Sequence, residues 1–171
     1  MVSWEIDARI YPHDFTKIDS FCSSRMKILF IAPVPPPIAG HALAAKVFLD
    51  ELTVSHKVEV VNLNKDSLKD GEVSSKRIAE VAKILVAVWR NRKDADIIYF
   101  TISESFAGNV KDLFIYLICF KSLSKMYIHL HGGSIGKLLF DRHRILSGIN
   151  KIFIKRLAGV IISGESLRGI F

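Results

Sequence analysis

The sequence predicts an α/β protein with a doubly wound, Rossmann-like parallel sheet in a single domain. Half of the 171 residues are hydrophobic and 24% are charged, which is typical of a folded domain with a sizeable core. Short apolar runs recur along the chain, and segments of helical periodicity separate them. Regular alternation of strands and helices is typical of doubly wound sheets.

The apolar runs are the expected strands. They are short and rich in β-branched residues, as strands covered on both faces usually are. They comprise KILFIA (27–32), KVEVVNL (57–63), DIIYFTI (96–102), MYIHLH (126–131) and GVIIS (159–163). Right-handed crossovers would bring the carboxyl ends of these strands to one edge of the sheet, where ligands bind in this class of fold.

The segments between the strands carry apolar residues at spacings of three and four, the pattern of a helix that buries one face. The expected buried stripes are Ala42, Ala45, Leu49 and Leu52; Ile78, Val81, Leu85 and Val88; and Phe106, Val110, Leu113, Leu117 and Phe120. The apolar run LFIYLICF (113–120) is far shorter than the roughly 20 residues that span a bilayer. We therefore expect it to be a buried helix face.

The regular pattern begins at Met26, and residues 1–25 show mixed polarity without a clear period. We expect residues 26–171 to form the domain, with residues 1–25 either a loosely attached extension or upstream of the natural start. The chain has two cysteines, no C-x-x-C motif and no apolar leader segment, which favours a reducing, cytoplasmic location. The net charge of +7 suits an anionic partner such as a phosphate ligand, an anionic lipid or a nucleic acid, and does not discriminate among them.

The stretch IAPVPPPIAGHA (31–42) joins the first expected strand to the first expected helix. It lacks the G-x-G-x-x-G fingerprint of dinucleotide-binding domains, and GGSIGKL (132–138) lacks the spacing of a P-loop. We expect the prolines to hold an extended path. The backbone of Ile38, Ala39, Gly40 and His41 would then present N–H groups to an anion at the helix start. The alternative is a rigid connector with a glycine chosen for its turn.

A second loop, HLHGGS, follows the fourth expected strand. We expect His129 and His131 to point to opposite faces, with His131 reaching the crevice at the strand ends beside Gly132 and Gly133. An imidazole there would hydrogen-bond a hydroxyl or a phosphate oxygen.

The third expected strand ends in TISES (101–105). Thr101 and Glu104 are candidates for the same crevice. The hydroxyls of this segment also fit a helix N-cap and first turn, the interpretation that we favour.

Taken together, these segments resemble the N-terminal domain of the family-4 retaining glycosyltransferases of the GT-B type. The resemblance covers residues 26–171 and rests on MKILFIAPVPPPIAGHALAAKVFLDEL, HKVEVVNL, ADIIYFTI, IHLHGG and GVIISGESLRGIF. It implies a domain that holds mainly the acceptor, with Gly40 near the diphosphate of a nucleotide-sugar donor and His131 near the transferred sugar. Ala39 stands where many relatives carry a second glycine.

The resemblance also implies that a C-terminal donor-binding domain with an E-x7-E element is missing from this chain, which we expect to be catalytically incomplete alone. It implies no bound metal and no cofactor apart from the nucleotide-sugar substrate. The expected partners are an acceptor glycan or glycolipid and a separate donor-binding domain or chain, without nucleic acid. The competing interpretation is a non-catalytic α/β module that docks on a membrane or a protein.

A basic segment spans residues 137–157, where six basic residues and one Asp give 6 − 1 = +5. Lys137, Arg144, Lys151 and Lys155 form one helical stripe, and Gly148 is expected to break or bend the helix. Such a helix can lie on an anionic membrane at the inner face of the cell envelope. The alternative is an ordinary solvated helix face.

Overall fold

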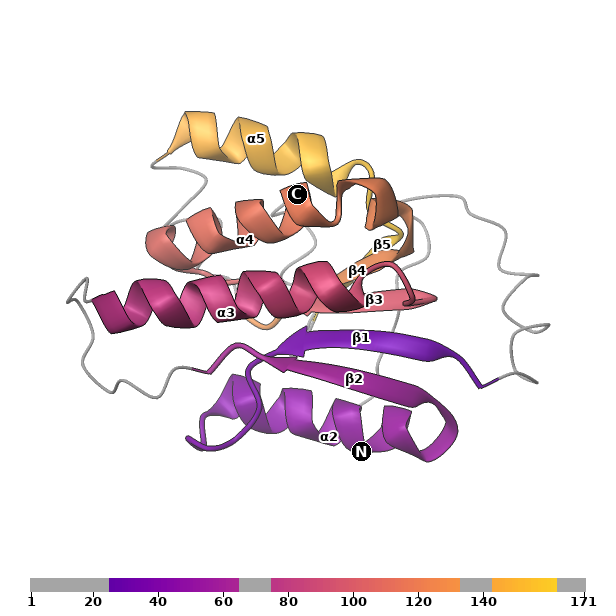
Figure 1. Ribbon diagram of the computed structural model, residues 1–171. Helices are drawn as coiled ribbons and strands as arrows, with labels where there is room; N and C mark the ends of the chain where they lie inside the picture. Colours follow the sequence, from indigo (N-terminus) through magenta and orange to yellow (C-terminus); the bar gives the residue numbers. More distant parts are fainter. Residues whose placement is uncertain (1–24, 65–74, 133–142, 163–171) are drawn as a thin grey trace.

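The computed structural model describes residues 25–64, 75–132 and 143–162, and within them it confirms the predicted α/β fold (Figure 1). All of the strands are parallel and lie in one sheet of order β2-β1-β3-β4-β5. The strands are β1 (Lys27–Ala32), β2 (Lys57–Asn62), β3 (Ile97–Thr101), β4 (Met126–Leu130) and β5 (Gly159–Ile162). The direction of winding reverses between β1 and β3, and this reversal marks the place where ligands bind in doubly wound folds.

Helices cover both faces of the sheet (Figure 1). One face carries α2 (Gly40–Ser55). The other face carries α3 (Ser75–Asn91), α4 (Phe106–Ile118) and α5 (Arg144–Ile154), which lie in a row, and the short 3-10 helix η2 (Phe120–Lys125) follows α4. Among the described residues, no helix combines the length and the apolar character needed to cross a bilayer.

Two hydrophobic cores result, one on each face of the sheet. Under α3, α4 and α5 lie the fully buried side chains of Leu29, Ile98 and Ile128, together with their neighbours. Under α2, the ring of Phe30 stacks on the ring of Tyr99 with centroids 4.4 Å apart. On the α2 side, Tyr99 is followed on the same face of the sheet by Thr101, which pairs in register with His129 of β4.

Two of the predicted helical stripes need correction. The stripe on α2 is confirmed, since Ala42, Ala45 and Leu49 are buried. On α3 the prediction is confirmed for Val88, which is fully buried, and for Leu85, which packs against the core. It is wrong for Ile78, whose side chain is 63% exposed, and it omitted Ile84, which is buried.

The predicted stripe that begins on α4 is wrong at Phe106, Leu117 and Phe120, which are about half exposed, whereas Leu113 packs against the core. The buried face of this helix carries polar residues as well as apolar ones. Asn109 and Asp112 are both buried there, and each finds a hydrogen-bonding partner inside the protein. Apolar periodicity cannot reveal a buried face of this kind.

Asn109 pairs with Asn150 of α5 through both side-chain amides. Asn109 Nδ2 donates to Asn150 Oδ1 (3.2 Å), and Asn150 Nδ2 donates to Asn109 Oδ1 (2.9 Å) and to the Leu146 carbonyl (2.8 Å). The expected break at Gly148 does not occur, and α5 runs through it without interruption. A helix tolerates one glycine at a cost of about 1 kcal/mol relative to alanine, and the packing of the flanking residues on α4 outweighs that cost.

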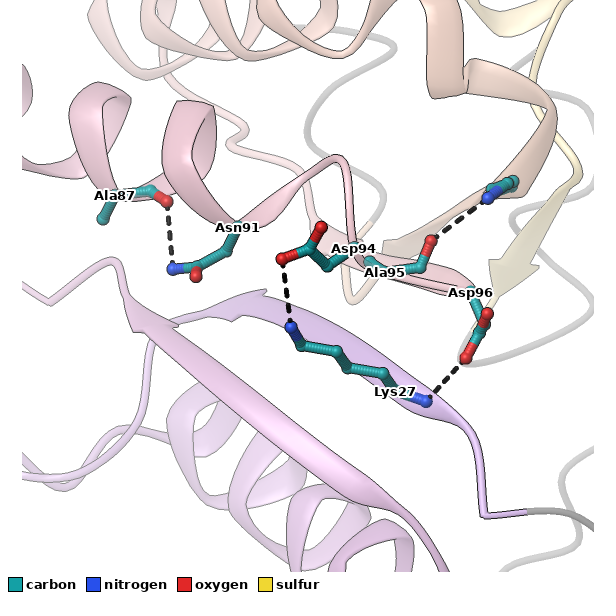
Figure 2. A network of polar contacts seen from close by, with 7 residues as sticks. Lys27, Ala87, Asn91, Asp94, Ala95 and Asp96 are labelled. Carbon is teal, nitrogen blue, oxygen red and sulfur yellow. Dashed lines mark hydrogen bonds and ion pairs between the residues drawn. The ribbon is translucent and has the colours of Figure 1, made fainter.

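The amino-terminal edge of the sheet is held by polar contacts of Lys27 (Figure 2). The Lys27 backbone N–H donates to Asp96 Oδ2 (2.8 Å), and its Nζ lies 3.4 Å from Asp94 Oδ2. Both carboxylates belong to the connection between α3 and β3, so these contacts fix the start of β1 against that turn. They lie at the opposite end of the strands from the predicted site.

Candidate functional site

The proline loop after β1 bends instead of following the expected extended path. Residues 35–37 turn, and the Pro35–Pro36 and Pro36–Pro37 peptide bonds are cis. The prolines supply no N–H groups, and the Val34 N–H is used within the protein, so the N–H groups left for a ligand lie after Pro37.

Two asparagines at the end of β2 hold this loop in place. Asn62 Oδ1 accepts from the Val34 N–H (3.0 Å), and Asn62 Nδ2 donates to the Val34 carbonyl (3.1 Å). Asn64 Nδ2 donates to the carbonyls of Val34 (2.6 Å) and Pro36 (3.2 Å). Sequence reasoning missed this clamp; the available signal was a pair of amide side chains at the end of the strand that neighbours β1.

Helix α2 begins directly after this loop, at the carboxyl edge of the sheet. Its N-cap residue, Ala39, is extended, and within the described residues no side chain caps this end of the helix. The first turn contains no acidic residue, and the N–H groups of Gly40, His41 and Ala42 have no acceptor within the helix. Among the described residues, a Cβ added to Gly40 would meet nothing within 4 Å. The helix therefore offers N–H groups and its positive dipole end to an anion in open space.

His129 and His131 lie on the same face of the sheet, so the prediction that they point to opposite faces is wrong. Residues two apart in a strand share a face, and the ring centroids of these histidines are 3.9 Å apart. His129 is buried within β4, whereas His131 follows the strand and is only partly buried. The prediction of a histidine at the strand end is retained for His131 alone.

Burial keeps both imidazoles neutral at pH 7. It lowers the pKa of His129 to about 3, with a further contribution from the charge of His131. It lowers the pKa of His131 to about 4, with a further contribution from the charge of His41. His41 follows β1 and His131 follows β4, and the effect of His41 on the pKa of His131 shows that the two side chains are within electrostatic range of each other.

The buried end of this cluster is a tyrosine. Burial raises the pKa of Tyr99 to about 12, and the nearby Thr101 hydroxyl has a smaller effect in the opposite direction. The phenol is thus protonated at pH 7 and hydrogen-bonded to His129 Nδ1. We infer that the phenol donates, which leaves the ring proton of neutral His129 on Nε2.

The loop after β3 brings a carboxylate to the same strand ends. An added Cβ on Gly132 would lie 2.2 Å from Glu104 Oε1, so the carboxyl group of Glu104 occupies the space that any other residue at position 132 would fill. The predicted crevice residues Glu104 and Gly132 are therefore neighbours.

The cap interpretation of TISES is also correct. Ser105 is the N-cap of α4, and its Oγ accepts from the Gly108 N–H (3.2 Å). Ser103 is tied to α4 as well, because its N–H donates to Asp112 Oδ2 (2.6 Å). Burial raises the pKa of Asp112, against the opposing effects of Lys111, whose Nζ lies 3.2 Å from Asp112 Oδ1, and of Ser103. These bonds hold the loop that carries Glu104.

Thr101, Arg144, Lys151 and Lys155 are the other predicted residues that the structure describes. Thr101 is buried beside His129 in the sheet, and its Oγ1 makes no hydrogen bond of standard geometry with the described residues. Arg144, Lys151 and Lys155 are exposed on α5, on the other side of the sheet. Gly133 and Lys137 lie outside the described residues, as does the extension at residues 1–24.

The site thus gathers helix N–H groups, a neutral imidazole and a carboxylate. Among the described residues, no three His, Cys, Asp or Glu side chains gather in a way that could hold a metal ion. Such a set suits the binding of a phosphate and of hydroxyl groups. Comparisons of the chain with protein-family models, curated proteins and solved structures found no match.

Proposed function

We propose that this chain is the acceptor-side domain of a glycosyltransferase that transfers a sugar from a nucleotide sugar to an acceptor hydroxyl. The setting would be cell-surface polysaccharide or glycolipid synthesis at the cytoplasmic face of a membrane. The observation that carries the proposal is the meeting of the uncapped start of α2, His131 and Glu104 at the carboxyl edge of the sheet, beside the reversal between β1 and β3. Ligands of doubly wound folds bind at this place.

Each part of the site has a distinct chemical task in such a reaction. The N–H groups and the positive end of α2 stabilise the charge on the departing diphosphate. Neutral His131 exchanges hydrogen bonds with a hydroxyl of the sugar, and the Glu104 carboxylate accepts one from another hydroxyl. The carbon–oxygen bond to the diphosphate breaks, a new carbon–oxygen bond to the acceptor forms, and the acceptor proton is released.

The first test uses inorganic pyrophosphate as a probe of the α2 start. In an amide NMR titration, millimolar pyrophosphate is expected to shift the signals of Ile38 to Ala42, because the uncapped N–H groups bind the anion. Gly40→Val is expected to abolish those shifts, since its side chain fills the open space beside Gly40. Gly148→Val is the matched control, because that glycine also has open space around it but lies on α5. If the shifts survive in Gly40→Val, the anion does not bind here.

The second test concerns the chemistry at His131. In a transfer-competent form of the protein, His131→Ala is expected to lower the rate of sugar transfer about ten-fold or more, the scale of a lost polar catalytic group. His56→Ala is the control, because His56 lies at the other end of α2. Equal rates for wild type and His131→Ala would remove His131 from the mechanism.

The alternative function, a non-catalytic docking module, is favoured by the exposed apolar side chains of α4 and α5. The two functions are separable by experiment. A docking module would bind its partner without any response to pyrophosphate or to nucleotide sugars, whereas the transferase domain responds at residues 38–42.

A further inference from the structure

Helix α5 exposes a ridge of isoleucines beside a stripe of cations. The exposed fractions are 83% for Ile145, 37% for Ile149 and 59% for Ile152. Their spacing of four and three places them in one row along the helix. Arg144, Lys151 and Lys155 are also exposed and form the adjacent row. The buried side of the same helix carries Leu146, Asn150, Phe153 and Ile154, so the isoleucine ridge is not its core-facing side.

The exposed apolar surface continues onto α4. The rings of Phe106 and His143 have centroids 4.9 Å apart at one end of the two helices. At the other end, the Arg156 guanidinium lies 4.8 Å from the centroid of Phe120, whose ring also meets Phe153 edge-on. We call Phe106, Leu117, Phe120, Ile145, Ile149 and Ile152 the α4/α5 surface. Every one of these side chains is exposed by a third or more.

The charge around the α4/α5 surface has one sign. Residues 105–132 and 143–162 contain seven lysines and arginines but one acidic residue, Asp112. Asp112 is fully buried and paired with Lys111, so this part of the molecule shows cations without exposed carboxylates. Exposed acidic residues such as Glu51, Glu59 and Asp94 belong to α2, β2 and the turn before β3. The positive charge is therefore concentrated where the apolar side chains are exposed.

We propose that the α4/α5 surface docks on an anionic lipid membrane as a peripheral interface. An exposed apolar row flanked by lysine and arginine is the arrangement that lies at the boundary between lipid headgroups and acyl chains. The isoleucine and phenylalanine side chains enter that boundary, and the cations meet the lipid phosphates. This surface does not include the α2 start, His131 or Glu104, so docking and ligand binding occur on different parts of the molecule.

The docked orientation leaves the candidate site accessible. Helix α5 connects β4 to β5, so its first residues lie at the carboxyl edge of the sheet and its last residues lie at the amino edge. A membrane that covers α4 and α5 therefore lies parallel to the strands. The carboxyl edge of the sheet, with the candidate site, is then at the side of the docked protein and is not covered by the membrane. An acceptor whose lipid part remains in the bilayer can reach that edge from the side.

The experiment is sedimentation of the protein with vesicles of phosphatidylcholine that contain about one-third phosphatidylglycerol. We expect binding that falls as salt is raised, because surface charge is screened over about 8 Å at physiological ionic strength. Vesicles of phosphatidylcholine alone are expected to bind much less. The double variants Ile145→Asn/Ile152→Asn and Lys151→Glu/Lys155→Glu are each expected to weaken binding about ten-fold or more, from loss of insertion and of charge attraction respectively.

Lys57→Glu/Lys93→Glu is the matched control, because it makes the same change in net charge at exposed lysines of β2 and of the turn before β3. It is expected to retain most of the vesicle binding. The proposal is overturned if the control weakens binding as much as Lys151→Glu/Lys155→Glu does. It is also overturned if the isoleucine variant binds vesicles normally, or if that variant dissociates a dimer of the wild type, which would identify a second copy as the occupant. The pyrophosphate response of Gly40 is measured independently, so either proposal can fail alone.

Discussion

Lowering the pH from 7 to 4 is expected to remove about 3 kcal/mol of unfolding free energy through His129, since each unit of pKa shift corresponds to about 1.36 kcal/mol. The pKa of His129 is lowered to about 3 in the folded protein, mainly by burial, from 6.5 in its absence. Between pH 6.5 and about 3, His129 binds a proton in the unfolded chain but stays neutral in the folded protein. Stability is therefore fully present above pH 6.5 and is lost as the pH falls toward 3.

The measurement is urea unfolding of the wild type and of His129→Gln at a series of pH values from 7.5 to 4. Glutamine does not titrate, and its amide oxygen can accept from Tyr99 Oη, so the variant is expected to lose less stability with acid. Asp112 also makes the stability depend on pH, but in the opposite direction. Because its pKa is raised in the folded protein, its contribution to the unfolding free energy is present at low pH and is lost as the pH rises through that pKa. Asp112 is present in both proteins, so the difference between their unfolding free energies reports His129. Parallel curves for the two proteins would contradict the prediction.

Replacing Asn150 with leucine is expected to lower the unfolding free energy by about 3 kcal/mol, because a buried polar group left without its partner costs about 1–3 kcal/mol. The replacement leaves both the donor and the acceptor of the Asn109 amide without Asn150 in a buried contact between α4 and α5. Leucine has a similar branched shape, so the loss reports hydrogen bonding more than volume. Thermal or urea unfolding measures it directly.

The control is the double variant Asn109→Leu/Asn150→Leu. Removing both partners leaves neither amide orphaned, so the double variant is expected to regain at least half of the stability lost by Asn150→Leu. If the losses of the two single variants simply add in the double variant, the amide pair does not couple the two helices.

The strands could be predicted from the sequence because each is a short, mainly apolar run that alternates with a helical segment. The stripe on α2 could be predicted for a similar reason, because that helix packs through apolar side chains such as Ala42, Ala45 and Leu49. The stripe on α4 could not, because its burial depends on Asn150, which lies 41 residues from Asn109 in the sequence. Apolar periodicity assigns Phe106 and Leu117 to the buried face of α4, but Asn109 and Asp112 lie on that face instead.

The candidate site was predicted in part. Gly40, His41, His131, Glu104 and Gly132 follow three different strands, and parallel topology alone brings strand ends together. The packing of His131 against His129 was missed through an error about the two-residue period of a strand. The asparagine clamp on the proline loop was missed for a different reason, since Asn62 reaches Val34 only after β1 and β2 have paired.

The paired amides of Asn109 and Asn150 also fix the rotation of α5 about its own axis. Successive residues of a helix are turned by about 100°, so rolling α5 by one position would bring a neighbour of Asn150 opposite Asn109 and leave that amide facing hydrocarbon. A core made of leucines alone would permit such a roll at small cost. The amide pair instead favours one rotation of α5, in which Ile145 and Ile152 are exposed and Phe153 is buried. The amide pair between Asn150 of α5 and Asn109 of α4 thus determines which side chains of α5 are available to a partner.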